Sequence, residues 1–293
     1  MSFTSFFQLI RWKNLLFIVA SQFLIKFLLI PKFESSSVFS VNDFLLLTIS
    51  TLLISAAGYI INDIFDIRVD KINKRKSSLT NNSISLKTAW FYYYFLNSLG
   101  LILGVWVSIK TNQTIFSLFF ISIVLILYAY SKKLKTKPLL GNILIASLLG
   151  FCILIIAFFE RFQINSYIFK IIFTYSLFAF LVNLIREIIK DIEDVNGDYV
   201  EGMKTLPILI GRKRTRNFSV ILSILFAVLL ITILILNKHI STLILYYGLI
   251  LIVLPLLYFI SKLTSAKSKK EYHKLSLLLK GIMVLGILSI FAL

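Results

Sequence analysis

The chain is poor in the residues that cross-link chains or interrupt helices. Its 293 residues include only 1 cysteine, 2 histidines and 4 prolines. The single cysteine, Cys152, excludes an intramolecular disulfide, and its place inside an apolar run indicates a packed side chain and not a metal ligand. The scarcity of proline permits long helices, because proline removes a backbone donor and clashes with the preceding helical turn.

Charged residues are also scarce, at 15% of the chain, whereas 58% of the residues are hydrophobic. A soluble domain carries roughly 25% charged residues, so lipid must be the solvent for much of this chain. The apolar runs approach the roughly 20 residues that a membrane helix needs, and they lack the strict alternation of barrel strands. A backbone in lipid must satisfy its own hydrogen bonds, which a helix does within one segment.

We therefore predict an all-α multi-pass membrane protein with about nine transmembrane helices. No cleavage site follows the first apolar run, so we interpret it as a membrane helix and not as a signal peptide. The predicted helices cover residues 12–31, 39–61, 90–109, 114–130, 139–159, 167–189, 218–237, 241–260 and 276–293.

The distribution of basic residues predicts the orientation. If the N-terminus is cytoplasmic, most of the 31 lysines and arginines fall at the cytoplasmic ends of the segments, as the positive-inside rule requires. The exceptions are Lys26, Lys32, Lys110, Arg161, Lys170 and Lys238. We expect a plasma (inner) membrane protein with its C-terminus outside. The net charge of +18 then reflects topology, and no nucleic-acid partner is expected, because the basic residues are dispersed among loops.

Most of the 13 acidic residues lie in two clusters, each at the cytoplasmic end of a predicted segment. The first cluster contains Asp63, Asp66 and Asp70, and the second contains Asp191, Asp194 and Asp198 with flanking glutamates. In both clusters the aspartates stand at i, i+3 and i+7, so they share one face of a helix. The spacing predicts a degenerate internal repeat in which the second and sixth segments are equivalent.

Three carboxylates on one helix face repel one another, and charges near a membrane are costly. Mg²⁺ offsets such clusters, since it typically takes one or two carboxylates together with substrate phosphate oxygens. The two clusters therefore predict a Mg²⁺-dependent diphosphate site on the cytoplasmic side. The alternative is a solvated loop face neutralised by Lys and Arg, which the repeated spacing argues against.

A diphosphate leaving group also needs fixed cations from the protein. The candidate cations lie within the clusters, after the fourth segment and after the second cluster: Arg68, Lys71, Lys190, Lys132, Lys133, Lys135 and Lys204. The positive-inside rule alone would place basic residues at these positions, so each remains one candidate among several.

These motifs resemble those of the UbiA-type intramembrane prenyltransferases. Asn62, Asp63, Asp66 and Asp70 match the family motif NDxxDxxxD, and the second aspartate trio matches its DxxDxxxD motif. Arg11-Trp12-Lys13-Asn14 is similar to the family's RPxN, and Tyr130-Ser131 through Asn142 is similar to its connection between segments 4 and 5. The run from Arg186 to Asp198, followed by Gly202–Pro207, most resembles the digeranylgeranylglyceryl phosphate synthase branch.

The resemblance implies a single domain over residues 1–293, with two pseudo-repeated four-helix units around a central active-site cavity and Asp motifs at 62–70 and 191–198. It implies Mg²⁺ ligands at Asn62, Asp63, Asp66, Asp70, Asp191, Asp194 and Asp198, with catalytic roles for Asp66, Asp194 and Asp198. It implies diphosphate contacts from Arg11, Asn14, Arg68, Tyr130, Lys132, Lys133, Lys190 and Lys204. The implied substrates are geranylgeranyl diphosphate and geranylgeranylglyceryl phosphate, with no obligate protein partner.

The chain departs from the family after the first motif. The segment Asn73-Lys74-Arg75-Lys76 and the residues that follow it lack the usual prolines and glycine, and this departure concerns acceptor specificity. Prenylation of an aromatic quinone precursor is therefore an alternative. A membrane transporter is the non-enzyme alternative, which inverted repeats and midplane charges would favour. Both acidic clusters lie on one side, however, and only Lys26 falls at a segment centre.

Overall fold

The computed structural model describes residues 3–34, 36–73, 79–81, 83–236 and 241–293. Lys74, Arg75, Lys76 and Lys238, which entered the sequence predictions, lie outside the described residues. The secondary-structure elements of the described part are all helices, joined by turns and loops. They are α1 (Phe3–Leu9), α2 (Trp12–Leu24), η1 (Ile25–Leu29), α3 (Ile30–Phe33), α4 (Val41–Ile72), α5 (Leu86–Lys110), α6 (Ile115–Lys132), η2 (Leu134–Thr136), α7 (Leu140–Phe159), α8 (Tyr167–Val200), α9 (Leu206–Ile210), α10 (Arg212–Leu236), α11 (Thr242–Tyr247), η3 (Gly248–Val253), α12 (Leu254–Ser265), α13 (Lys269–Leu288) and η4 (Ser289–Phe291).

Within the described ranges, 9 helical stretches are long and apolar enough to cross a membrane, which confirms the predicted fold class. They are Trp12–Phe33, Val41–Ile72, Leu86–Lys110, Ile115–Lys132, Leu140–Phe159, Tyr167–Val200, Arg212–Leu236, Thr242–Ser265 and Lys269–Phe291. Several helices are longer than the apolar runs from which they were predicted. The helices α4 and α8 continue through both aspartate motifs, so each trio of carboxylates does lie on one helix.

Serine side chains begin five of these helices. Each accepts a hydrogen bond from the backbone N–H three residues later, which satisfies a donor that the helix itself leaves unpaired. The capping residues are Ser40, Ser85, Ser166, Ser241 and Ser268. Local sequence therefore sets where α4, α5, α8, α11 and α13 start.

Two of the few prolines explain the irregular turns in the first and eighth spans. Pro31 and Pro255 each follow a π-helical segment, η1 and η3 respectively. A proline ring clashes with the carbonyl four residues earlier, here at Phe27 and Leu251, and a wider π turn relieves that clash. The two spans therefore stay helical but change their local pitch at these points.

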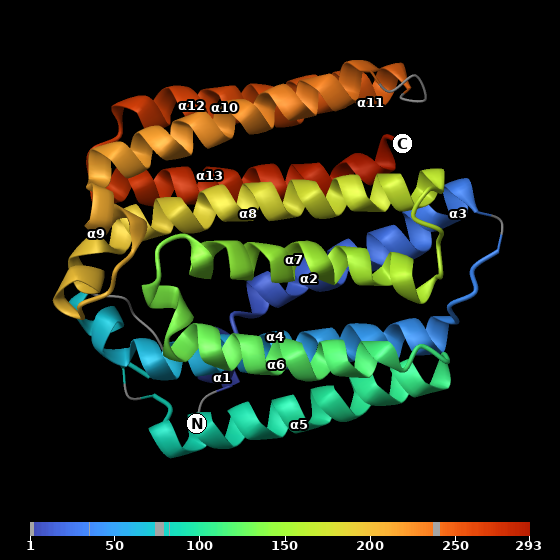
Figure 1. Ribbon diagram of the computed structural model, residues 1–293, viewed down its shortest axis with the longest axis horizontal. Helices are drawn as coiled ribbons and strands as arrows, with labels where there is room; N and C mark the ends of the chain where they lie inside the picture. Colours follow the sequence, from blue (N-terminus) through green and yellow to red (C-terminus); the bar gives the residue numbers. More distant parts are fainter. Residues whose placement is uncertain (1–2, 35, 74–78, 82, 237–240) are drawn as a thin grey trace.

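The helices run roughly parallel to one another, and the bundle is built in layers (Figure 1). The helices α4, α5 and α6 form one side, α7, α8 and α13 pack in the middle, and α10 and α12 form the other side. The C-terminal ends of α4 and α8 lie at the same end of the bundle, which we term the motif end. Fully buried Phe44 and Phe159 belong to the core at the opposite end.

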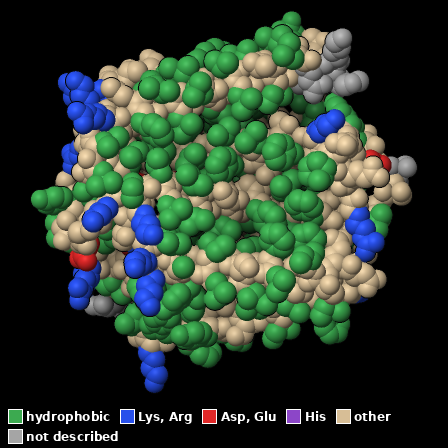
Figure 2. Space-filling model, in the orientation of Figure 1, with side chains coloured by type: hydrophobic (Ala, Val, Ile, Leu, Met, Phe, Trp, Pro, Cys, Tyr) green, Lys and Arg blue, Asp and Glu red, His purple; other side chains and the backbone are tan. Residues whose placement is uncertain are grey.

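The surface agrees with a membrane-embedded bundle. Hydrophobic side chains cover the middle of the face shown in Figure 2, while lysine and arginine gather mainly at the motif end. Large apolar side chains such as Phe91, Trp106 and Leu125 are more than half exposed on the outer helices α5 and α6. Such exposure is expected where lipid and not water covers the side chains.

Candidate active site

A cavity of about 270 Å³ lies among α2, α4, α6, α7, α8 and α13, where a central cavity was predicted. Polar and charged side chains line its motif end, and mostly apolar side chains, with Thr51 and Ser55, line the remainder. The polar lining includes Arg11, Asn14, Tyr59, Asn62, Asp66, Asp70, Tyr130, Lys135, Asn142, Asn183, Arg186, Glu187, Lys190, Asp191, Asp194, Asp198, Thr205 and Lys280. The cavity therefore has a charged end at the motifs and a mainly apolar part beyond them.

The first motif contributes two carboxylates to this cavity. Asp66 and Asp70 line it, and Asn62 donates a hydrogen bond of 2.7 Å from Nδ2 to Oδ2 of Asp66. Asp63 points elsewhere, because its Oδ1 accepts a 2.6 Å bond from Nη2 of Arg11, and it is not among the lining residues. Its role as a metal ligand therefore stays a prediction.

Arg11 lies between α1 and α2 in a left-handed backbone conformation, with φ of 52°. Its guanidinium packs over the ring of Tyr59, 5.2 Å from the ring centre. Desolvation would lower the pKa of Arg11, but the adjacent carboxylate of Asp63 outweighs it and raises the pKa. Arg11 is therefore a permanent cation that anchors α1 and α2 to the first motif.

The second motif contributes all three of its aspartates. Asp191 accepts a 2.8 Å hydrogen bond at Oδ2 from Asn142, and Asp198 accepts one of 3.4 Å at Oδ2 from Thr205. Asp194 lies 3.8 Å from Nζ of Lys269. All three aspartates line the cavity, as the spacing on one helix face predicted.

Asn73 joins the two motif helices. Its side chain donates to the backbone carbonyl of Asp194 at 3.4 Å and accepts from the backbone N–H of Gly197 at 3.2 Å. A Cβ at Gly197 would stand 2.4 Å from Nδ2 of Asn73, so only glycine permits this approach. The contact holds the end of α4 against α8 and so sets the separation of the carboxylates.

The donor set fits a hard divalent cation such as Mg²⁺. Two helices supply five aspartates to one end of the cavity, and three of these, Asp70, Asp194 and Asp198, are at most 8% exposed. Within the described part of the chain, no group of three or more His, Cys, Asp or Glu side chains stands close enough together to hold an ion alone. That spacing suits ions bound partly by substrate oxygens, because Mg²⁺ typically combines one or two carboxylates with phosphates.

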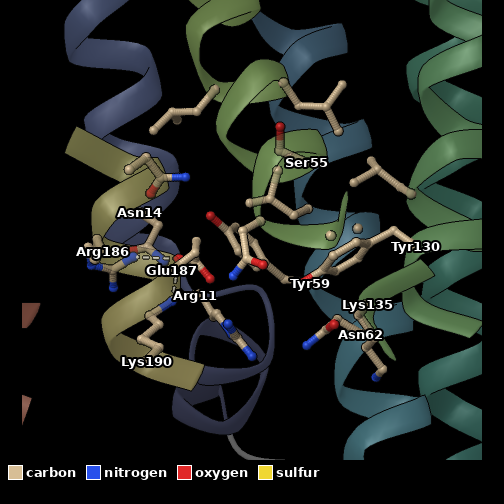
Figure 3. Close-up of a pocket in the computed structure, with 18 of the residues that line it drawn as sticks. Arg11, Asn14, Ser55, Tyr59, Asn62, Tyr130, Lys135, Arg186, Glu187 and Lys190 are labelled. Carbon is tan, nitrogen blue, oxygen red and sulfur yellow. Dashed lines mark hydrogen bonds and ion pairs between the residues drawn. The ribbon is translucent and has the colours of Figure 1, made fainter. Parts of the chain in front are cut away.

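Cations stand on two walls of the cavity, with Lys135 on one and Arg186 and Lys190 on the other (Figure 3). On one wall, Nζ of Lys135, which follows α6, forms an ion pair with Asp66. On the other wall, Arg186 and Lys190 of α8 both bond Oε1 of Glu187, at 3.0 and 2.7 Å. Of the predicted diphosphate contacts, Arg11, Asn14, Tyr130 and Lys190 line the cavity.

Four predicted diphosphate contacts lie outside the cavity lining. Arg68, Lys132, Lys133 and Lys204 are exposed, and Lys132 instead packs over the ring of Tyr128 at 5.6 Å. Of the three lysines after the fourth segment, the structure brings Lys135 to the site, because the short η2 turn reverses the chain direction there. The diphosphate contacts of Arg68, Lys132, Lys133 and Lys204 stay predictions, while Lys135, also a candidate cation, lines the cavity.

Several residues that line the cavity were not predicted as site residues. Asn142, Glu187 and Arg186 stood in motifs that the sequence had already singled out, but no spacing rule marked them as cavity residues. Lys280 had a usable signal, a charged residue within an otherwise apolar segment. Asn183 and Tyr59 carried no such signal.

The apolar part of the cavity extends far from the carboxylates. Thr51 is fifteen residues from Asp66 along α4, or about 22 Å at the rise of an α-helix. Phe120 of α6 and Ile155 of α7 line the same distal part. The remaining apolar lining includes Phe17, Ile18, Ile54, Ile123, Leu127, Ile145, Leu148, Leu149, Phe151, Cys152 and Met283, with Val69 and Met203 nearer the carboxylates.

Comparison with known proteins gives this geometry a context. Residues 32–281 match the family model described as the UbiA prenyltransferase family. The chain is 31% identical to the digeranylgeranylglyceryl phosphate synthase of Thermococcus gammatolerans over 80% of this chain and 79% of that protein. It is 34% identical to the synthase of the same name from Methanosarcina mazei, over 77% of each chain.

Solved structures agree with the fold. A structure described as a digeranylgeranylglyceryl phosphate synthase aligns with a TM-score of 0.66 at 27% identity, over 99% of both chains. A UbiA homologue from Archaeoglobus fulgidus, bound to GPP and Mg²⁺, aligns with a TM-score of 0.65 at 18% identity, over 98% of this chain and 99% of that one. The second likeness shows a shared fold.

Proposed function

Because this chain belongs to the UbiA prenyltransferase family, we propose that it transfers a geranylgeranyl group from its diphosphate to geranylgeranylglyceryl phosphate. One observation carries the proposal: carboxylates of both motifs line one end of a single cavity whose other part is apolar. A prenyl diphosphate has the same division between a charged head and a hydrocarbon tail. The names of the relatives support the choice of acceptor.

The charged end is suited to ionising the donor. Asp66, Asp70, Asp191, Asp194 and Asp198 would hold Mg²⁺ with the diphosphate oxygens. Asn62 would orient Asp66 through its hydrogen bond, and Asp63 would orient Arg11. Bound Mg²⁺ would supply Lewis-acid stabilisation of the leaving group. Lys135 and Lys190 place fixed positive charge at the same end, where negative charge develops as the C–O bond breaks.

The apolar part would hold the prenyl tail and exclude water from the allylic cation. Apart from the Cys152 thiol, the side chains of α6 and α7 that line this length are aliphatic or aromatic, so they keep water away from the cation. The attacking hydroxyl must lose its proton, and Glu187, between Arg186 and Lys190, is a cavity carboxylate available as acceptor.

Gly104 of α5 allows us to test this assignment of the tail. A Cβ at Gly104 would stand 2.6 Å from Cγ of Phe120, so Gly104→Ala should displace that ring towards the cavity. We expect the ratio of kcat/KM for geranylgeranyl diphosphate to kcat/KM for geranyl diphosphate to fall about tenfold, a typical size for steric discrimination in an apolar pocket. The matched control is Gly281→Ala, where a Cβ meets nothing within 4 Å. An equal loss for both donors would contradict the assignment.

We also infer that the motif end is cytoplasmic. The support is the gathering of Lys and Arg at that end, together with the positive-inside rule. In a Cys152→Ala background, a membrane-impermeant maleimide added to intact cells should label Gln163→Cys, at the opposite end, and leave Lys133→Cys unlabelled until the cells are lysed. The reverse labelling pattern would show that the motif end lies outside the cell.

Purified protein with Mg²⁺ and both proposed substrates should yield the doubly prenylated lipid by mass spectrometry, and EDTA should abolish it. Transfer to an aromatic quinone precursor alone would retain the chemistry and reject the acceptor. Folded protein that transfers to neither acceptor would overturn the proposed function.

A further inference from the structure

Lys280 is a charged residue in the apolar part of a membrane helix. It lies eleven residues into α13, about 16 Å from Lys269 along the helix axis. It lines the cavity, and its Nζ donates a 2.8 Å hydrogen bond to Oδ1 of Asn14. An ionisable side chain at such a position is costly and calls for a counter-charge, which the neutral amide of Asn14 does not provide.

Arg186 approaches the same wall of the cavity from α8. Its Nη1 bonds Glu187, while its Nε is buried and has no hydrogen-bond partner among the described residues. A guanidinium has five donors, and a buried donor without a partner is unfavourable. Arg186 also lines the cavity, so its guanidinium has donor capacity there that the bond to Glu187 does not use.

Positive charge is in excess on this wall. The cations Arg186, Lys190 and Lys280 all line this part of the cavity. The carboxylate on this wall, Glu187, is shared between Arg186 and Lys190. An anion bound between Arg186 and Lys280 would offset the repulsion and complete the hydrogen bonds of the guanidinium.

We propose that Arg186 and Lys280 form the binding site for the phosphate of the acceptor lipid. The proposal rests on the proposed function and extends it to the second substrate. The donor diphosphate is assigned to the aspartate end, whereas Arg186 lies five residues from Asp191 towards the membrane centre, about 7.5 Å along α8. The acceptor phosphate at Arg186 and Lys280 would leave the acceptor hydroxyl directed towards the first carbon of the donor. Guanidinium groups suit this task because they bind phosphate through two parallel hydrogen bonds.

The test uses Lys280→Gln and Arg186→Gln in the full-length protein. Glutamine at 280 keeps a donor for Asn14 but removes the charge, so packing and charge are separated. We expect each variant to raise KM for geranylgeranylglyceryl phosphate about 10- to 100-fold, the effect of losing a charged hydrogen bond. KM for geranylgeranyl diphosphate should change less than about twofold, and Lys280→Arg should recover most of the loss. Lys274→Met, an exposed lysine on the same helix, is the matched control.

The preference for phosphate gives a second measurement. Wild-type protein should favour the phosphorylated acceptor over geranylgeranylglycerol, and both glutamine variants should lose most of that preference. A parallel rise in KM for the donor, or an unchanged preference, would overturn the phosphate site while leaving the proposed function intact. Wild-type protein that transfers to neither form of the acceptor would instead overturn the proposed function, and the phosphate site with it.

Discussion

Replacing Asp66 or Asp194 with asparagine is expected to lower kcat by at least about a hundredfold, because the Lewis-acid contribution of a bound ion amounts to several kcal/mol. Asparagine keeps the shape of the side chain and one oxygen ligand but removes the negative charge. Both carboxylates line the cavity, and they come from different motifs. The loss should therefore appear with either substitution alone. The measurement is single-turnover transfer at a series of Mg²⁺ concentrations.

Each motif helix supplies a matched control. Asp43→Asn lies at the other end of α4, where Asp43 pairs with Lys110 at 2.6 Å. Glu193→Gln lies on α8 between two motif aspartates but faces His273, at 3.1 Å, and not the cavity. Both controls should retain activity within about threefold, as expected for residues remote from the chemistry. If Asp66→Asn or Asp194→Asn retained full activity at saturating Mg²⁺, the assignment of metal ligands would be wrong.

Lys26→Met is expected to destabilise the protein by roughly 3–5 kcal/mol, the usual cost of leaving one member of a buried ion pair alone. Lys26 is 4% exposed and Glu160 2%. Their ion pair joins η1 to the end of α7, far from the motif end. Ser37 and the backbone of Phe39 complete the cluster, since both bond the same two side chains. The measurement is equilibrium unfolding in mixed micelles.

The double variant Lys26→Met/Glu160→Met distinguishes a pair interaction from loss of packing. If the uncompensated charge dominates, the double variant should regain most of the stability that Lys26→Met loses, because no charge then remains buried. Prenyl transfer per folded molecule should be unchanged, since neither residue lines the cavity. A double variant with the summed loss of the two single variants would show that shape and packing, and not charge, account for the effect.

Much of the architecture could be predicted because its causes are local. Apolar runs of membrane length predicted all nine spans of the described residues, and serine caps and prolines explain where several helices begin or change pitch. The spacing of Asp191, Asp194 and Asp198 predicted a shared face, and all three line the cavity. Cytoplasmic placement of the motifs and the pseudo-repeat of two four-helix units stay predictions.

The sequence by itself determined that this protein is a helical membrane bundle with two aspartate motifs, because hydrophobicity and helical periodicity act within single segments. Only the tertiary structure decided which charges meet. Asp63 turns to Arg11 while Asp66 turns to Lys135, and Lys280 joins Arg186 at the cavity from a helix far away in sequence. These pairings depend on how the helices pack and rotate against one another, which residue spacing along one helix cannot specify.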